Sequence, residues 1–146
     1  MKSELSNRPI AMTELEPLLR KFQKELSAGT VSLALLAVMA AAAEPMYGYQ
    51  IAKRLEHVGE GVLAGKQSAL YPVLRNLGAA GLLDSFVEPS VAGPPRRYYR
   101  ITTLGREMLQ AWIAAWRATR DSVEAVLAPV TDPSTPVAPS NPGLPL

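Results

Sequence analysis

The clearest chemistry in this 146-residue chain lies in a short basic stretch, Arg96-Arg97-Tyr98-Tyr99-Arg100, where three arginines surround two tyrosines. Guanidinium groups form charge-assisted, bidentate hydrogen bonds with phosphate and carboxylate oxygens. In a strand, alternate residues share a face, so we expect Arg96 and Arg100 on one face and Arg97 on the other. One face can then pack while the other meets a phosphate backbone. The alternative is a solvated edge hairpin whose charges prevent pairing with a strand of another chain.

A second set of candidate contacts lies on a predicted helix that begins at about Ser68. Pro72 is tolerated only in the first turn of a helix, and Ser68 is a good N-cap. On the face opposite its leucines, Arg75 can pair with guanine or phosphate, unless it is an ordinary solvated arginine. Tyr71, on the flank, either packs under the strands or touches the same partner. Further phosphate contacts are expected from Lys53, Lys66, Gln67 and Ser68.

The composition excludes several kinds of active site. There are no cysteines, which removes disulfides, thiolate nucleophiles and Cys-ligated zinc. His57 is the single histidine and the acidic residues are scattered, so we expect no metal site, no cofactor and no enzyme. The net charge of +2 is too small to indicate nucleic-acid binding by itself, so that inference depends on where the charges lie.

The elements that position these residues are mainly helical. An amphipathic helix is expected to begin at Thr13 or Glu16, with Pro17 in its first turn, and to end near Gly29. Thr30–Ala43 is apolar nearly all round, which predicts a central buried helix. At about 14 residues, this run is shorter than a membrane span, so we expect no membrane segment and a cytoplasmic location.

A short helix over Tyr47–Val58 follows, with Ile51, Leu55 and Val58 facing inward. The helix from Ser68 is expected to end at Gly81 in a left-handed cap. Its predicted buried face consists of Leu70, Val73, Leu74 and Leu77.

Two strands and a long helix complete the pattern. The strands are predicted over Leu83–Glu88 and Arg96–Ile101, and Thr102 caps a helix from Thr103 to about Leu127, roughly 37 Å long. The order of three helices, two strands and a long helix is that of a winged helix-turn-helix. The expected fold is therefore mostly α, with a three-helix core, a two-stranded wing, a long C-terminal helix and an extra N-terminal helix.

The chain accordingly divides into an N-terminal arm and amphipathic helix (1–28), a winged helix-turn-helix domain (29–102), a C-terminal dimerisation helix (103–128) and a proline-rich tail (129–146). The tail has six prolines in 18 residues and one charge, which predicts disorder. Its prolines at 133, 136 and 139 are also spaced as in a polyproline turn. A docking ligand is therefore an alternative interpretation, although no arginine flanks it.

Several stretches, in order and with the right gaps, resemble the PadR-like transcriptional regulators. They are Pro45–Ile51 (PMYGYQI), Leu70–Leu77 (LYPVLRNL) with Gly81-Leu82-Leu83, and Gly93–Thr102 (GPPRRYYRIT) with Gly105-Arg106. The resemblance covers about residues 24–127. It implies a homodimeric winged-helix DNA-binding protein, usually a repressor, whose last helix forms the dimer interface. One departure is Ser68-Ala69, where the family usually has Gly-Thr or Gly-Ser.

The last helix carries more apolar side chains than one winged-helix body can bury, which predicts a second chain against it. The expected dimer contacts are Leu104, Met108, Trp112, Ile113, Trp116, Val123 and Leu127. A two-fold dimer would place two recognition helices roughly 34 Å apart, so we expect a pseudo-palindromic operator. The expected function is a ligand-responsive, sequence-specific repressor. The alternative is a winged-helix module that binds another protein.

The resemblance also implies an effector. In the multidrug-sensing branch of the family, a tryptophan of the last helix lines a pore at the dimer interface and stacks on flat aromatic compounds. Counted from Gly105, Trp116 takes that position, and Trp112 is the second candidate. Aromatic stacking contributes roughly 0.5–1.5 kcal/mol per pair. Alternatively, both indoles belong to the core of the dimer.

Overall fold

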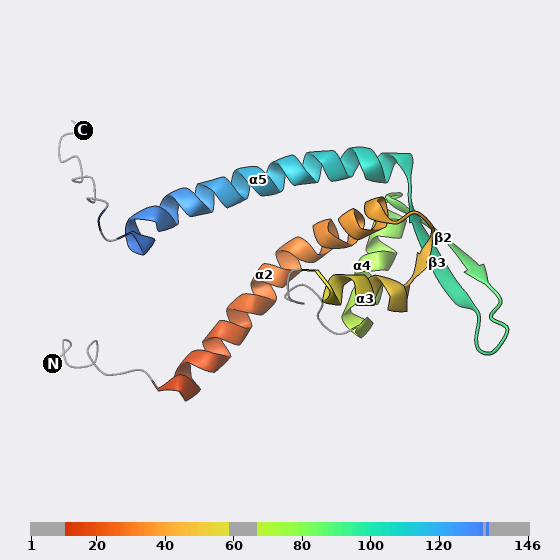
Figure 1. The fold of residues 1–146 in the computed structure, drawn as a ribbon, viewed down its shortest axis with the longest axis horizontal. Coiled ribbons are helices and arrows are strands. Elements are labelled where there is room, and N and C mark those ends of the chain that lie inside the picture. Colours follow the sequence, from red (N-terminus) through yellow and green to blue (C-terminus); the bar gives the residue numbers. More distant parts are fainter. Residues whose placement is uncertain (1–10, 59–66, 133, 135–146) are drawn as a thin grey trace. The chain divides into compact units, whose positions relative to one another are not determined.

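The structure is a computed structural model that describes residues 11–58, 67–132 and 134 (Figure 1). Over these residues it contains four helices and one three-stranded antiparallel sheet. The elements are α2 (Met12–Ala41), β1 (Met46–Tyr47), α3 (Gly48–Glu56), α4 (Gln67–Ala79), β2 (Leu83–Glu88), β3 (Arg96–Ile101) and α5 (Thr103–Thr131). The chain forms two compact units, Met1–Leu109 and Gln110–Leu146. The predicted fold class, a mostly helical winged helix, is confirmed, and the four-part division of the chain stays a prediction.

The first two predicted helices are one continuous helix, so the expected end near Gly29 is wrong. α2 spans 30 residues, and its N-cap is Ala11 rather than Thr13 or Glu16. A glycine inside a helix costs only about 1 kcal/mol relative to alanine. The hydroxyl of Thr30, next to it, donates to the carbonyl of Leu26 at 3.0 Å and so makes its hydrogen bond within the helix. Gly29 therefore weakens α2 without ending it.

The C-terminal half of α2 is a central core element, as its apolar run predicted. Leu35, Leu36 and Met39 are buried against the other elements. By length and composition, α2 is also the one helix in the described part of the chain that could cross a membrane. Core helices of soluble proteins satisfy the same criterion, so this observation alone carries little weight.

Helices α3 and α4 contribute buried side chains to the same core, which also includes Met46, Leu82, Leu83, Tyr99 and Leu109. The inward orientation predicted for α3 is confirmed except at Val58, which is 61% exposed because α3 ends at Glu56. The buried side chains of these two helices include Ile51, Leu55, Leu70, Leu74 and Leu77. Val73, expected in this set, is only partly buried.

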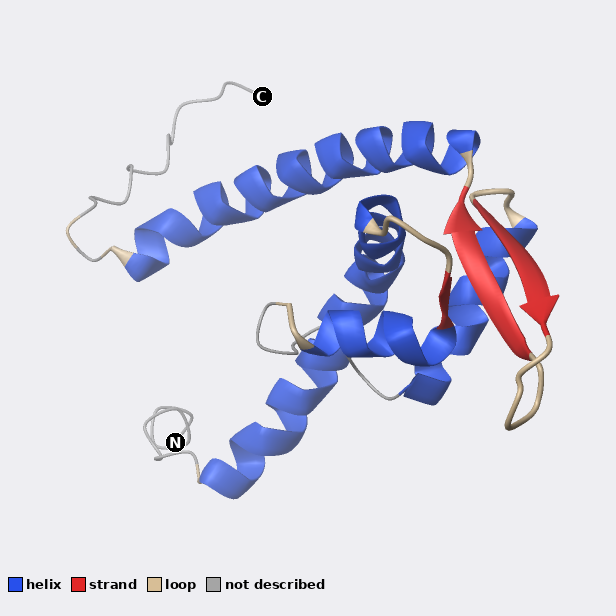
Figure 2. Ribbon diagram, turned by 45° about the vertical axis from the view of Figure 1, so that its right-hand side comes forward, coloured by secondary structure: helices blue, strands red, loops and turns tan. Residues whose placement is uncertain are grey.

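The sheet has one strand more than the sequence predicted. Its order is β1-β3-β2, and β1 pairs Met46 with Tyr99 and Tyr47 with Tyr98. The sequence predicted a helix from Tyr47, whereas α3 begins at Gly48. A strand of two residues shows no alternation that could reveal it. The β2–β3 hairpin itself has the predicted bounds and projects from the helices (Figure 2).

A tight junction joins α4, the hairpin and the start of α5. Gly81 ends α4 with a φ of +79°, the left-handed cap that the sequence predicted. The Thr102 hydroxyl donates to the Gly81 carbonyl at 2.7 Å and accepts the N–H of Gly105 at 2.9 Å. Thr102 is therefore both the predicted cap of α5 and the link between α5 and the turn that follows α4.

α5 continues past the predicted end near Leu127 and through Pro129 to Thr131. Proline removes one helical N–H, but the next turn is retained because the N–H of Asp132 donates to the Ala128 carbonyl at 3.1 Å. The first three residues of the predicted tail are therefore helical. Pro133 and residues 135–146, for which disorder was expected, lie outside the described residues.

Candidate nucleic-acid interface

A groove of about 630 Å³ lies between α4 and the core-facing side of the β2–β3 hairpin. From α4 it is lined by Tyr71 and Arg75, and from the hairpin by Ser85, Arg97 and Tyr99. The sequence assigned Arg75 and Arg97 to two separate elements, and the structure brings them to one groove. Because α4 is the third helix of the winged helix, this groove borders the element that reads DNA in that fold.

A hydrogen bond orients Arg97 in this groove. Its Nη1 donates to the Ser85 hydroxyl at 3.0 Å, across the β2–β3 ladder. The guanidinium has five donors, so the group keeps further N–H groups for an acceptor. The groove can therefore present two arginines, Arg75 and Arg97, to the oxygens of a phosphate group.

The electrostatics of Tyr99 support this arrangement. Burial raises the pKa of the Tyr99 hydroxyl above 10.0, Arg97 and Arg75 act to lower it, and Tyr71 acts to raise it. Arg75, Arg97 and Tyr71 thus all lie close enough to influence the same buried hydroxyl. Tyr99 stays neutral at physiological pH, so it adds no negative charge that would repel a phosphate.

The other two wing arginines lie on the outer face of the sheet, as the alternation predicted. The Arg96 guanidinium lies 4.5 Å from the ring centroid of Tyr47. Arg100 Nε lies 3.8 Å from a carboxylate oxygen of Asp84, and both side chains are exposed. Exposed ion pairs of this kind are weak, so Arg100 stays available to an anion. The three arginines therefore do not form one patch, because Arg97 faces the groove and the other two face away from it.

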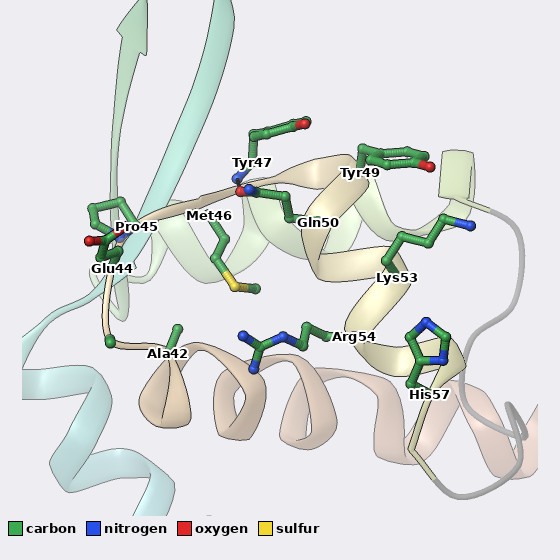
Figure 3. Close-up of a pocket in the computed structure, with 11 residues that line it drawn as sticks. Ala42, Glu44, Pro45, Met46, Tyr47, Tyr49, Gln50, Lys53, Arg54 and His57 are labelled. Carbon is green, nitrogen blue, oxygen red and sulfur yellow. Dashed lines mark hydrogen bonds between the residues drawn. The ribbon is translucent and has the colours of Figure 1, made fainter.

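Lys53 lies apart from the groove, in a second pocket of about 430 Å³ between the end of α2, β1 and α3 (Figure 3). Its Nζ is 3.6 Å from Glu56 and 5.5 Å from the ring centroid of Tyr49. The structure therefore does not bring Lys53 together with Arg75 and Arg97. Lys66 lies outside the described residues. Gln67 and Ser68 form the first turn of α4, and their side chains are not among those described.

Tyr71 packs against α3 and lines the groove, and its contact with DNA stays a prediction. Its ring packs against α3 at Gly48, where an added Cβ would lie 2.7 Å from Tyr71 Cε1. The same side chain is 40% exposed and lines the groove. Gly48 thus permits the close approach of α3 and α4 at this point.

Sequence reasoning missed Ser85, Tyr47, Tyr49 and Gln50. Tyr47 N–H donates to Gln50 Oε1 at 3.1 Å, which helps to start α3. A Gln or Glu three positions after the N-cap is a known helix-start signal, and it could have identified the role of Gln50. Nothing local identifies Ser85, because its partner Arg97 is twelve residues away.

The residues proposed for dimerisation and effector binding lie along α5. Trp112 and Ile113 are partly buried, whereas Trp116 is 39% exposed. The other members of the set are exposed: Leu104, Met108, Val123 and Leu127. Among the described residues, no group of three or more His, Asp or Glu side chains could hold a metal ion.

Comparisons with known proteins agree with this geometry. A model of the PadR-like transcriptional regulator family matches residues 35–111. The crystal structure of a PadR family transcriptional regulator from Eggerthella lenta is 31% identical, with a TM-score of 0.65, over 80% of this chain and 97% of that one. A PadR-like regulator from Bacillus cereus is 25% identical, with a TM-score of 0.57, over 70% and 96%.

Among curated proteins, the chain is 26% identical to an uncharacterised protein of Lysinibacillus sphaericus over 78 residues, which are 53% of this chain and 72% of that protein. The family match spans the helical core, the wing and the first turns of α5. Proteins of this family are DNA-binding regulators rather than enzymes in general. The chain therefore belongs to the PadR-like family of transcriptional regulators.

Proposed function

We propose that this protein is a ligand-responsive repressor that binds a pseudo-palindromic operator as a homodimer in the cytoplasm. The observation that carries the DNA-binding part is the groove in which Arg75 of α4 and Arg97 of β3 converge. Two guanidinium groups from different elements can hold one phosphate and so set the position of α4 on the duplex.

The roles of the arginines follow from their places. With α4 in the major groove, Arg97 contacts the backbone beside it. Arg96, on the outer face of the wing, contacts the backbone further along. Arg75 either shares the phosphate with Arg97 or extends to a guanine, and the two roles differ in sequence specificity.

Dimerisation is supported by the apolar side chains exposed on α5. Leu104, Val123 and Leu127 are each more than two-fifths exposed in the single chain. A second copy packed against this face would remove them from water. The effector site rests on the family resemblance and on Trp112 and Trp116, which lie four residues apart and so share one face of α5.

Binding to the promoter fragment of the protein's own gene tests the DNA-binding part. With about six phosphate contacts per dimer, the log–log slope of affinity against salt is expected to be about −5. The paired substitution Arg96→Ala/Arg97→Ala should weaken binding to all DNA sequences. Arg75→Ala should weaken operator binding more than non-specific binding if Arg75 reads a base, and both equally if it holds a phosphate.

A matched control is Arg20→Ala/Lys21→Ala, which removes the same two charges from the exposed part of α2. This variant should leave the affinity nearly unchanged. A shallow salt slope, or no retardation of the fragment, would instead favour a protein-interaction module. Trp116→Ala should abolish release of the promoter by planar aromatic compounds while retaining operator binding.

A further inference from the structure

Four aromatic side chains form a continuous row on the outer face of the sheet and the start of α3. We call Phe86, Tyr98, Tyr47 and Tyr49 the aromatic row. Phe86 and Tyr98 are 5.6 Å apart and nearly parallel, and Tyr98 meets Tyr47 edge-on at 5.5 Å. Tyr47 and Tyr49 are 6.4 Å apart. The row therefore crosses β2, β3 and β1 and continues onto α3.

The aromatic row lies on the opposite face of the sheet from the proposed DNA groove. Tyr99 and Arg97, which line that groove, alternate with Tyr98 along β3 and so face the other way. Tyr49 is 48% exposed, and the other three rings are partly exposed. Tyrosines with one apolar side and one wet side are typical of interaction surfaces. The row is thus a surface feature that neither the core nor the DNA groove uses.

Cations accompany the row at two points. The Arg96 guanidinium lies 4.5 Å from the centre of Tyr47, and Lys53 Nζ lies 5.5 Å from the centre of Tyr49. A ligand for this surface must therefore have apolar groups at regular intervals and carry no positive charge of its own.

The proline segment, which we define as residues 132–146, has these properties. Prolines recur at every third position, at 133, 136, 139, 142 and 145, and the single charge is that of Asp132. A polyproline II helix has three residues per turn and rises about 3.1 Å per residue, so these prolines would share one edge about 9 Å apart. Successive rings of the row are 5.5–6.4 Å apart, so prolines about 9 Å apart would contact alternate rings rather than adjacent ones. Aromatic surfaces of this kind recognise proline-rich segments in several peptide-binding domains.

The length of α5 favours a segment from another copy. α5 has 29 residues, which at 1.5 Å each separate Thr131 from Thr103 by about 43 Å. Fifteen residues of polyproline helix reach about 46 Å. A return along its own helix would therefore use nearly the whole segment before any proline met the row.

We propose that the aromatic row is a docking site for the proline segment of a second copy of this chain. The site lies beside the wing, so its occupancy would order the wing without entering the DNA groove. Arg96 borders the row and is also a proposed contact to the DNA backbone, so docking is tested without DNA, where it does not depend on operator binding.

The absence of cysteine allows a direct test on the full-length protein. One chain carries Ser140→Cys with a nitroxide label, and a second, unlabelled at that position, is enriched in ¹⁵N. The two are mixed before refolding, and the paramagnetic broadening of amide signals is measured without DNA. We expect selective broadening at Tyr47, Tyr49, Phe86 and Tyr98 that disappears when ascorbate reduces the nitroxide.

Two variants show whether prolines and rings carry the contact. Tyr49→Ala in the ¹⁵N chain should weaken docking about fivefold, which is the loss of roughly 1 kcal/mol from one aromatic contact. Pro136→Ala/Pro139→Ala in the labelled chain should weaken it at least as much. The matched control, Val91→Ala, changes a fully exposed side chain in the wing loop and should have no effect.

Several outcomes would overturn the proposal. Broadening that is absent from the mixed sample, or present only when both labels are on one chain, excludes a second copy as the source. Equal broadening along α5 would indicate a non-specific encounter. If a single-stranded oligonucleotide displaces the label and binds the row more tightly than the segment, the row is a base-stacking surface instead.

Discussion

Gly105, in the first turn of α5, is the position where the structure predicts the largest effect from the smallest change. A Cβ added there would lie 2.2 Å from the Leu82 carbonyl oxygen and 2.7 Å from Ile101 Cγ1. The carbonyl cannot move freely, because it accepts a hydrogen bond from the N–H of Thr102 at 3.1 Å. Gly105→Ala must therefore separate α5 from the end of the wing.

The magnitude follows from two opposing contributions to the free energy of unfolding. Overpacking of a rigid site costs about 3 kcal/mol at the upper end of its usual range. Alanine recovers about 1 kcal/mol through its higher helix propensity. We expect a net destabilisation of about 2 kcal/mol, which for a chain of this size lowers Tm by about 6 °C.

Gly29→Ala is the matched control, because nothing lies within 4 Å of a Cβ at Gly29 in the middle of α2. The same substitution should here stabilise the protein by about 1 kcal/mol. Urea unfolding measures both at one fixed protein concentration, so that any association of the chain affects the two variants and the parent protein equally. A Gly105→Ala variant as stable as the parent protein would refute the packing argument.

Two further predictions concern the same junction and its neighbouring strand. Thr102→Val should destabilise the protein by about 1–2 kcal/mol, because it removes the cap of Gly105 N–H and the bond to the Gly81 carbonyl, as chemical denaturation would show. Because burial raises the folded-state pKa of Tyr99, the neutral phenol is favoured in the folded protein. Its contribution is present below pH 10 and is lost as pH rises through the folded pKa, so stability should fall at high pH. Tyr99→Phe should reduce that fall, and an unchanged stability–pH profile above pH 10 would contradict it.

The sequence predicted best where the signal is local. The left-handed cap at Gly81 and the N-cap at Thr102 were both identified correctly, since each depends on groups within a few residues. The strand alternation correctly placed Arg97 and Arg96 on opposite faces, because a period of two is visible in six residues.

The errors have equally physical causes. The sequence predicts a helix end at Gly29, but no left-handed conformation forms there and α2 continues. β1 was missed because two residues become a strand only when Tyr98 and Tyr99 of β3 pair with them. The structure at Gly29 is decided by the helix on both sides of it, and the structure at Met46–Tyr47 is decided by pairing with β3. Neither can be read from the local residue types.

The convergence of the candidate site was also beyond sequence reasoning. Arg75 and Arg97 lie 22 residues apart along the chain, and Ser85, which orients Arg97, carries no motif of its own. The groove exists because the buried faces of α4 and of the hairpin meet at Leu74, Leu83 and Tyr99.

The amino-acid sequence alone determined the order from α3 and α4 through the β2–β3 hairpin to α5, the basic wing and the family resemblance, because helix caps, strand alternation and short motifs depend on neighbours along the chain. Only the tertiary structure decided that Arg97 joins Arg75 while Arg96 joins the aromatic row. That choice depends on which face of the sheet is buried against α4, and burial is set by side chains that are distant in the sequence and adjacent in space.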